Sequence, residues 1–126
     1  MPQKNNPSLI LVAGPYRSNT GDDPEKIANH LHQMNVAGLE LFRLGHIPIT
    51  GEALALPLIA VAGSKQIGDE VFNEIFHPIA RLLIERVDAV LRVGGASSGA
   101  DEMVTLARAA GKQIYIAVDE IEKVRD

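Results

Sequence analysis

Blocks of apolar residues alternate with polar segments along the chain, in an order that predicts strands and helices in turn. Residues 8–13 form a short, continuous apolar run that stops at Gly14 and Pro15. Such a run is typical of a strand that is buried on both faces of a parallel sheet. Residues 24–44 instead place apolar side chains at helical spacing, and Gly45 is well placed to end that helix. The chain therefore begins with a strand and a long helix.

Polar residues mark the start of this helix. Pro24 suits the first helical position, where its missing N–H costs nothing, and Asp23 before it suits the cap. Asp22 and Glu25 stand at the spacing of a capping box and form the alternative cap. Both alternatives place the helix start within residues 22–25.

The remaining segments predict three more strands and several helices. Pro48 cannot donate to a strand ladder, so the second strand belongs at a sheet edge. A helical turn or two is expected around Pro57, and His77-Pro78 is expected to interrupt the next helix and restart it. The predicted strands are 47–50, 88–93 and 113–118, and the predicted helices are 52–61, 69–76, 77–87, 100–110 and a frayed 119–124.

Alternating strands and helices favour parallel strand pairing through crossover connections. We therefore expect an α/β fold: a doubly wound, flavodoxin-like or Rossmann-like parallel sheet of about four to five strands with helices on both faces. Residues 8–126 are expected to form one domain, and residues 1–7 a disordered N-terminal tail. In such folds ligands bind beyond the carboxyl ends of the strands, where the strand order reverses.

Composition and charge exclude several classes of function. The 126 residues carry a net charge of −4 without a run of Lys or Arg, so duplex nucleic acid is not an expected partner. There is no Cys, which excludes disulfides and thiol nucleophiles and favours a reducing cytoplasm. The polar start of the chain does not resemble a signal peptide, and the uncharged run 53–62 has about half of the roughly 20 residues that a membrane span needs. The histidines lack metal-ligand spacing, and neither a metal nor a cofactor is expected.

The loop after the first strand has the chemistry of an anion site. Gly14 and Pro15 let the backbone approach a ligand closely, and Tyr16 adds an aromatic ring. Arg17 can bind a phosphate or carboxylate through paired donors. The alternative is that Arg17 is a solvated surface charge and that the Gly-Pro pair only turns the chain. The segment lacks the glycine spacing of a dinucleotide fingerprint or a P-loop.

The loop after the third strand, residues 94–99, is a second candidate. Gly95, Ser97, Ser98 and Gly99 lead directly into a helix, so hydroxyl groups and free N–H groups would face a phosphate together. The alternative is a tight strand-to-helix connection in which the glycines only permit close packing. Asp101 and Glu102 favour the helix dipole in the first turn, so acidity alone does not make them catalytic.

Several motifs, taken in order, resemble the nucleoside 2-deoxyribosyltransferase superfamily, and in particular its small members and its deoxynucleotide N-hydrolases. The likeness covers most of the chain. The motifs that carry it are Leu-Val-Ala-Gly-Pro-Tyr-Arg at 11–17, Leu-Gly-His-Ile-Pro at 44–48, Val-Asp-Ala-Val at 87–90, and Ser-Gly-Ala at 98–100, with Ala107 and Gly111-Lys112 after them.

The resemblance implies binding of a nucleoside or nucleotide and cleavage of its N-glycosidic bond, with a Glu attacking the anomeric carbon and an Asp assisting at the base. It places Gly14, Tyr16 and Arg17 on one binding loop. Ser97, Ser98 and Gly99 fall on the other loop, where the sugar or its phosphate is held. It also implies a homo-oligomer with pockets near the subunit contacts.

The catalytic positions depart from this pattern. The position of the family's Glu is Met103, and that of its Asp is Ala80. Glu102 or Asp101 could replace the nucleophile only if the loop differs in length, since each helical residue turns by about 100°. His77 is a second candidate acid or base. Three hypotheses follow: an N-glycosidase or deoxyribosyltransferase, a non-catalytic nucleotide sensor, or a structural oligomer subunit that uses the Leu-rich stretch 54–59.

Overall fold

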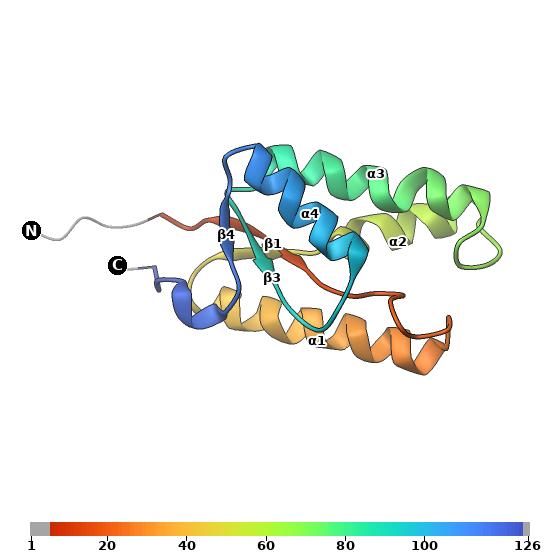
Figure 1. The fold of residues 1–126 in the computed structure, drawn as a ribbon, viewed down its shortest axis with the longest axis horizontal. Helices are drawn as coiled ribbons and strands as arrows, with labels where there is room; N and C mark the ends of the chain where they lie inside the picture. Colours follow the sequence, from red (N-terminus) through yellow and green to blue (C-terminus); the bar gives the residue numbers. More distant parts are fainter. Residues whose placement is uncertain (1–5, 125–126) are drawn as a thin grey trace, which may run out of the picture.

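The computed structural model describes residues 6–124 as an α/β fold around a four-stranded parallel sheet (Figure 1). The strands are β1 (Leu9–Ala13), β2 (Ile47–Ile49), β3 (Ala89–Arg92) and β4 (Gln113–Tyr115), in the order β2-β1-β3-β4. The helices are α1 (Pro24–Arg43), α2 (Gly51–Val61), α3 (Glu70–Arg86) and α4 (Ser98–Ala109), followed by the 3₁₀ turn η1 (Val118–Glu120). The predicted fold class is confirmed. None of the helices in residues 6–124 has the length and hydropathy that a membrane span requires. Residues 1–5 of the predicted tail lie outside the described part of the chain.

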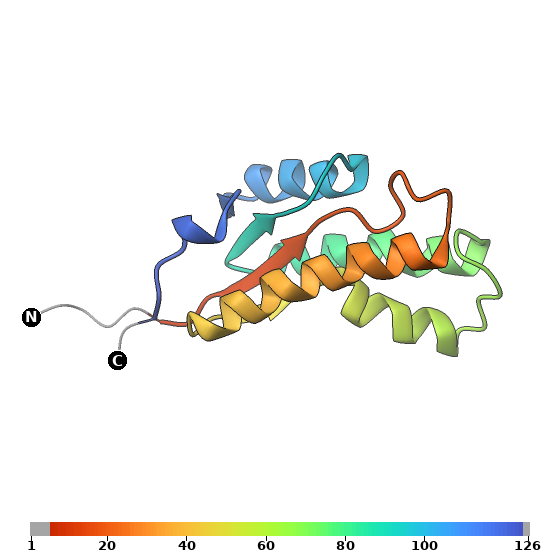
Figure 2. The ribbon, with the colours of Figure 1, turned by 90° about the horizontal axis from the view of Figure 1, so that it is seen from below.

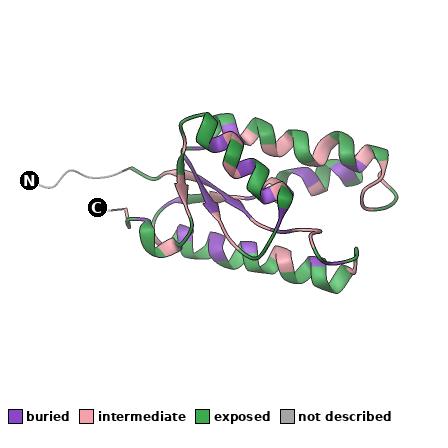
Figure 3. Cartoon of the chain, in the orientation of Figure 1, coloured by how far each residue is buried: buried purple, intermediate pink, exposed green. Residues whose placement is uncertain are grey.

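The central strand β1 is buried on both faces, as its unbroken apolar sequence predicts. Ile10 and Val12 pack with the buried face of α1, whereas Leu11 and Ala13 pack with α3 and α4 on the other face. Figure 1 shows α1 on one side of the strands and α3 and α4 on the other. The two inner strands, β1 and β3, are therefore the most continuously buried part of the sheet (Figure 3). Each large aliphatic side chain buried in this way contributes about 1.5–3 kcal/mol to stability.

The strand order places a topological switch point between β1 and β3. From β1 the chain passes through α1 to the edge strand β2, and from β2 it passes through α2 and α3 to β3 on the opposite side of β1. The β1–β3 pairing continues past the strand ends, because the Val93 N–H donates to the Ala13 carbonyl at 2.9 Å. The loop after β1 and the first turn of α4 consequently lie side by side (Figure 2).

The ends of α1 follow the predicted chemistry. Asp23 is the cap, and its carboxylate accepts the Glu25 N–H at 3.1 Å, whereas the alternative cap, Asp22, bonds elsewhere. At the other end Gly45 takes a positive φ of 92°, and the next N–H, that of His46, donates to the Leu41 carbonyl at 3.0 Å. This left-handed residue ends the helix.

Several predicted boundaries were wrong. Helix α3 runs unbroken through Pro78 where two helices were expected, whereas α2 fits the predicted range 52–61 but continues through Pro57 for more than the expected turn or two. Each proline removes one backbone donor, but α2 and α3 pack along one another around Phe72, and this contact outweighs the local cost. Helix α4 starts at Ser98, before the expected residue 100.

The end of the sheet also differs from the prediction. Strand β4 stops at Tyr115, because the Glu120 carboxylate accepts the N–H groups of Ile116 and Ala117, at 2.7 and 3.2 Å. Within the described residues the expected terminal helix at 119–124 is reduced to the single turn η1.

Candidate functional site

A pocket of about 600 Å³ lies at the switch point, beyond the carboxyl ends of β1 and β3. Its size suits a drug-sized or nucleotide-sized ligand. Six of the eight predicted binding residues line it: Gly14, Tyr16, Arg17, Ser97, Ser98 and Gly99. Pro15 and Gly95 lie outside its lining. The wall also includes α3, where sequence reasoning named His77 and Ala80, and the first turn of α2, which it did not connect to the site.

Close packing holds the two loops together. A Cβ atom on Gly14 would lie 3.0 Å from the Val93 carbonyl oxygen, and one on Gly94 would lie 2.7 Å from Cδ of Pro15. Gly94 also has a φ of 77°, which favours glycine. Pro15 and Gly94 therefore position the pocket without lining it.

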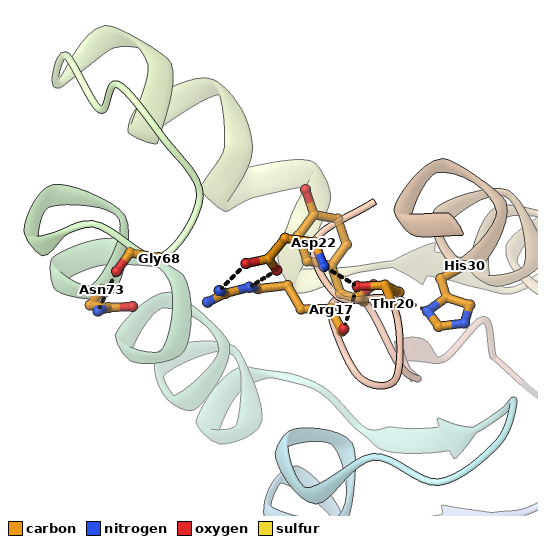
Figure 4. A network of polar contacts seen from close by, with 7 residues as sticks. Arg17, Thr20, Asp22, His30, Gly68 and Asn73 are labelled. Atoms are coloured by element: carbon orange, nitrogen blue, oxygen red, sulfur yellow. Dashed lines mark hydrogen bonds and ion pairs between the residues drawn. The ribbon is translucent and has the colours of Figure 1, made fainter. Parts of the chain in front are cut away.

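The loop after β1 is organised by its own hydrogen bonds (Figure 4). The Arg17 carbonyl accepts both the Thr20 N–H at 3.1 Å and the Thr20 hydroxyl at 2.6 Å. The Asp22 N–H in turn donates to the Thr20 hydroxyl oxygen at 3.1 Å. Asn19 and Asp22 have positive φ angles, 61° and 58°, which Asn and Asp tolerate better than most residues. The result is a compact turn that fixes the direction of the Arg17 side chain.

The Arg17 guanidinium already contacts neighbouring residues of the same chain. Its Nε and Nη2 atoms both donate to the Asp22 carboxylate at 2.9 Å. This hydrogen-bonded pairing raises the pKa of Arg17 and lowers the pKa of Asp22. The guanidinium also lies 5.7 Å from the centre of the Phe72 ring and against Gly68. An arginine has five N–H donors, so three are not used by Asp22.

The first turn of α4 presents donors to the same pocket. The Ser97 side-chain oxygen caps the helix by accepting the Ala100 N–H at 3.1 Å, which leaves its hydroxyl hydrogen free to donate. The N–H groups of Ser98 and Gly99 belong to the first turn, where an α-helix has no internal acceptor. Ser97 is buried and Ser98 is exposed, and both line the pocket.

The two predicted catalytic carboxylates lie in different places. Asp101 is outside the pocket lining, and it accepts from Nε of Arg92 at 3.1 Å with 70% of its side chain exposed. Arg92 also donates to the Val93 and Gly95 carbonyls, so this ion pair supports the loop. Glu102 does line the pocket, and it pairs at 3.1 Å with Arg81 near the surface. The assignment of either residue as a catalyst stays a prediction.

Met103 and Ala80 line the pocket as well. By the resemblance, which stays a prediction, these two positions correspond to the superfamily's Glu and Asp. Met103 is 6% exposed and packs in the core between the sheet, α3 and α4. A thioether and a methyl group therefore occupy the part of the wall where carboxylates would be expected, and neither can move a proton.

Glu52 is the carboxyl group that sequence reasoning did not identify. It lies in the first turn of α2, is 8% exposed and lines the pocket. Burial raises the pKa of Glu52 to about 7. Its one distinguishing mark in the sequence is that it precedes ten uncharged residues, 53–62, but an acidic residue at a helix start is ordinary.

An aromatic group forms another part of the wall. The Tyr16 and Phe76 rings lie 5.2 Å apart, and Phe76 stacks on Phe72 at 4.7 Å. Burial, and then the charge of Glu52, raise the pKa of the Tyr16 hydroxyl, so it stays protonated at neutral pH. His77 meets Phe76 edge-on at 5.2 Å and also lines the pocket. Of these rings, Tyr16, Phe76 and His77 line the pocket, at an angle to one another.

Within residues 6–124 no three His, Asp or Glu side chains gather as a metal ion would require. His46 has a structural role instead: its Nδ1 accepts the Ser8 N–H at 3.0 Å, and its Nε2 lies 2.7 Å from the Glu122 carbonyl oxygen.

Neither a protein-family model nor a curated protein matches this sequence.

Proposed function

We propose that the chain binds a nucleoside or a nucleotide in the pocket between the loop after β1 and the first turn of α4. The observation that carries this proposal is the meeting of Arg17, Ser97 and Ser98 around one hollow at the switch point of a parallel sheet. Ligands of doubly wound folds bind at this place.

The first turn of α4 suits the phosphate or sugar end of the ligand. It offers the Ser97 and Ser98 hydroxyls together with backbone N–H groups at the positive end of a helix dipole. Asp101 and Glu102 would repel an anion there, but Arg92 and Arg81 pair with them. Tyr16 and Phe76 suit the base, because an aromatic face stacks on any base.

A ligand panel tests the proposal. Deoxynucleosides and their 5′-monophosphates are added to the protein, and the melting temperature and the heat of binding are measured. We expect monophosphates to stabilise the fold by about 3 kcal/mol at a hundredfold excess over Kd. Arg17→Ala and Ser98→Ala should weaken that binding, whereas Lys26→Ala, an exposed cation outside the pocket, should leave it unchanged. If none of these compounds binds, the proposal is refuted.

Cleavage of the N-glycosidic bond of the bound ligand is a second candidate function. The observation in its favour is that Glu102 keeps a carboxylate at the pocket although Met103 cannot act as a nucleophile. Incubation with the same panel and detection of free base tests it. Release that is lost in Glu102→Gln would support an enzyme, and binding without release would support a nucleotide sensor.

A structural subunit of a homo-oligomer is the remaining alternative. Leu54 and Leu58 on α2 are 40% and 48% exposed, whereas Ala55 and Ile59 on the same helix are buried. Half of the Leu-rich stretch therefore faces outward. Light scattering after size exclusion measures the molar mass, and an oligomer that binds none of the panel would favour this alternative over a nucleotide-binding role.

A further inference from the structure

Arg17 is the only lysine or arginine among the described residues that line the pocket. Three acidic residues line the same hollow: Asp22, Glu52 and Glu102. Glu102 is paired with Arg81, which lies outside the lining, but Asp22 is paired with Arg17 itself. The one guanidinium that the pocket wall could offer to an anionic ligand is therefore already neutralised from within the chain.

The pair between Arg17 and Asp22 has the form in which an arginine binds an oxyanion ligand. Nε and Nη2 of Arg17 donate to different oxygens of the Asp22 carboxylate, both at 2.9 Å (Figure 4). Two parallel bonds of this kind are the arrangement by which a guanidinium binds a carboxylate or a phosphate. A ligand that uses this edge of Arg17 therefore has to displace Asp22.

The other edge with paired donors is covered as well. A Cβ atom on Gly68 would lie 2.8 Å from both Nη1 and Nη2 of Arg17, and 3.1 Å from Cζ. Gly68 thus lies beyond the two terminal nitrogens, and the guanidinium carbon lies 5.7 Å from the centre of the Phe72 ring. These contacts hold Arg17 against the start of α3, so the edge that Asp22 occupies is the one that a ligand could take over.

Asp22 is the partner that can leave this arrangement. Its side chain is 44% exposed, and an exposed ion pair is weak, so moving the carboxylate into water costs little. The backbone of the turn is held separately, because the Asp22 N–H donates to the Thr20 hydroxyl oxygen at 3.1 Å. An anion can therefore replace the carboxylate at Arg17 without rearranging the loop.

We propose that Asp22 is an autoinhibitory competitor in the pocket: its carboxylate occupies the paired donors of Arg17 until the phosphate of a nucleotide replaces it. This inference rests on the proposed nucleotide-binding function and adds a regulation of that site. Each binding event breaks one ion pair within the chain, so the affinity for phosphate is lower than an unoccupied Arg17 would give.

A double-mutant cycle tests the proposal, with deoxyadenosine 5′-monophosphate as the probe in calorimetric titrations. Asp22→Asn keeps the turn, because Asn tolerates the positive φ of 58°, but its amide cannot form an ion pair with Arg17. We expect Asp22→Asn to bind the probe about three- to fivefold more tightly than the unmodified protein does. In a chain that already carries Arg17→Gln, the same change should alter the affinity by less than about twofold.

Asp23→Asn is the matched control. It removes the same charge one residue further along the chain, outside the pocket lining, and Asn remains a good cap for α1. We expect it to leave the affinity for the probe within about twofold of the unmodified protein. Circular dichroism verifies the folding of every variant.

Two results would overturn the proposal while nucleotide binding itself stands. Equal affinities of Asp22→Asn and the unmodified protein would show that Asp22 does not compete with the ligand. A gain that is as large with Arg17→Gln as without it would show that Asp22 acts as a general charge and not through Arg17. If neither the unmodified protein nor Asp22→Asn binds any monophosphate of the panel, this inference and the proposed function fail together.

Discussion

Glu52 makes the stability of the chain depend on pH. Its pKa is about 7 in the folded state and near 4.5 when solvated, so the folded chain holds a proton that the unfolded chain releases between these values. The free energy of unfolding therefore falls as the pH rises through this window. We expect Glu52→Gln to be more stable than the unmodified protein above about pH 8, by up to about 3 kcal/mol, and no more stable below about pH 4.5. Urea denaturation at both pH values measures this difference.

Glu74→Gln is the control, because that carboxylate is exposed on α3. A gain for Glu52→Gln that is equal at both pH values would contradict the argument, since it would reflect helix propensity rather than a buried charge.

At the level of single residues, the sequence predicted the donors of the pocket better than its acid. Arg17, Ser97 and Ser98 stand in glycine-rich loops after strands, and such loops have a recognisable pattern. Glu52 has no comparable pattern, because its burial depends on how α2 packs against α3 and β1. Packing between segments that are distant in the sequence cannot be predicted from the spacing of neighbouring residues.

Among the elements, α3 and the loop before it depend on Asp69. Its carboxylate accepts the Phe72 N–H at 2.8 Å, the Lys65 N–H at 2.9 Å and the Ser64 hydroxyl at 2.8 Å. These bonds lower the pKa of Asp69 to about 2. Because the folded pKa is depressed, the stabilisation is present above the ordinary pKa of Asp and is lost as the pH falls towards 2. We expect Asp69→Ala to lower the melting temperature by several degrees at neutral pH, and by less in acid.

Thermal unfolding followed by circular dichroism measures this effect. Asp69→Asn keeps one acceptor for the cap and should lose less stability than Asp69→Ala. Equal losses in the two variants at neutral pH would show that the charge, and not the cap, supports this end of α3.

The elements themselves were predicted to the extent that local chemistry decides them. Strand β1 and the Asp23 cap of α1 follow from short patterns, and both are observed. The continuity of α3 through Pro78 was missed, because contacts with α2 decide it. The early end of β4 was missed for a similar reason: the Glu120 carboxylate takes backbone donors that a strand would use.

For the whole molecule, the alternation of strands and helices was enough to predict a pocket at the switch point, because parallel strands direct their carboxyl ends to one edge of the sheet. What alternation does not show is that the second wall comes from α2 and α3, which belong to the connection between β2 and β3. The loop after β1 and the loop after β3 meet where Gly94 packs against Pro15.

Gly94→Ala tests whether this meeting point shapes the pocket. Gly111 provides a matched control, because its φ of 76° is nearly that of Gly94, 77°, but a Cβ atom there would meet nothing within 4 Å. Both substitutions carry a backbone cost of about 1–2 kcal/mol. Gly94→Ala also drives a methyl group to 2.7 Å from Cδ of Pro15. A clash of that kind adds about 1–3 kcal/mol unless the loops separate.

We therefore expect Gly94→Ala to lower the free energy of urea unfolding more than Gly111→Ala does. We also expect Gly94→Ala to weaken nucleotide binding, whereas Gly111→Ala leaves it intact. Equal losses of stability, with binding unaffected in both variants, would show that the two loops hold their places independently.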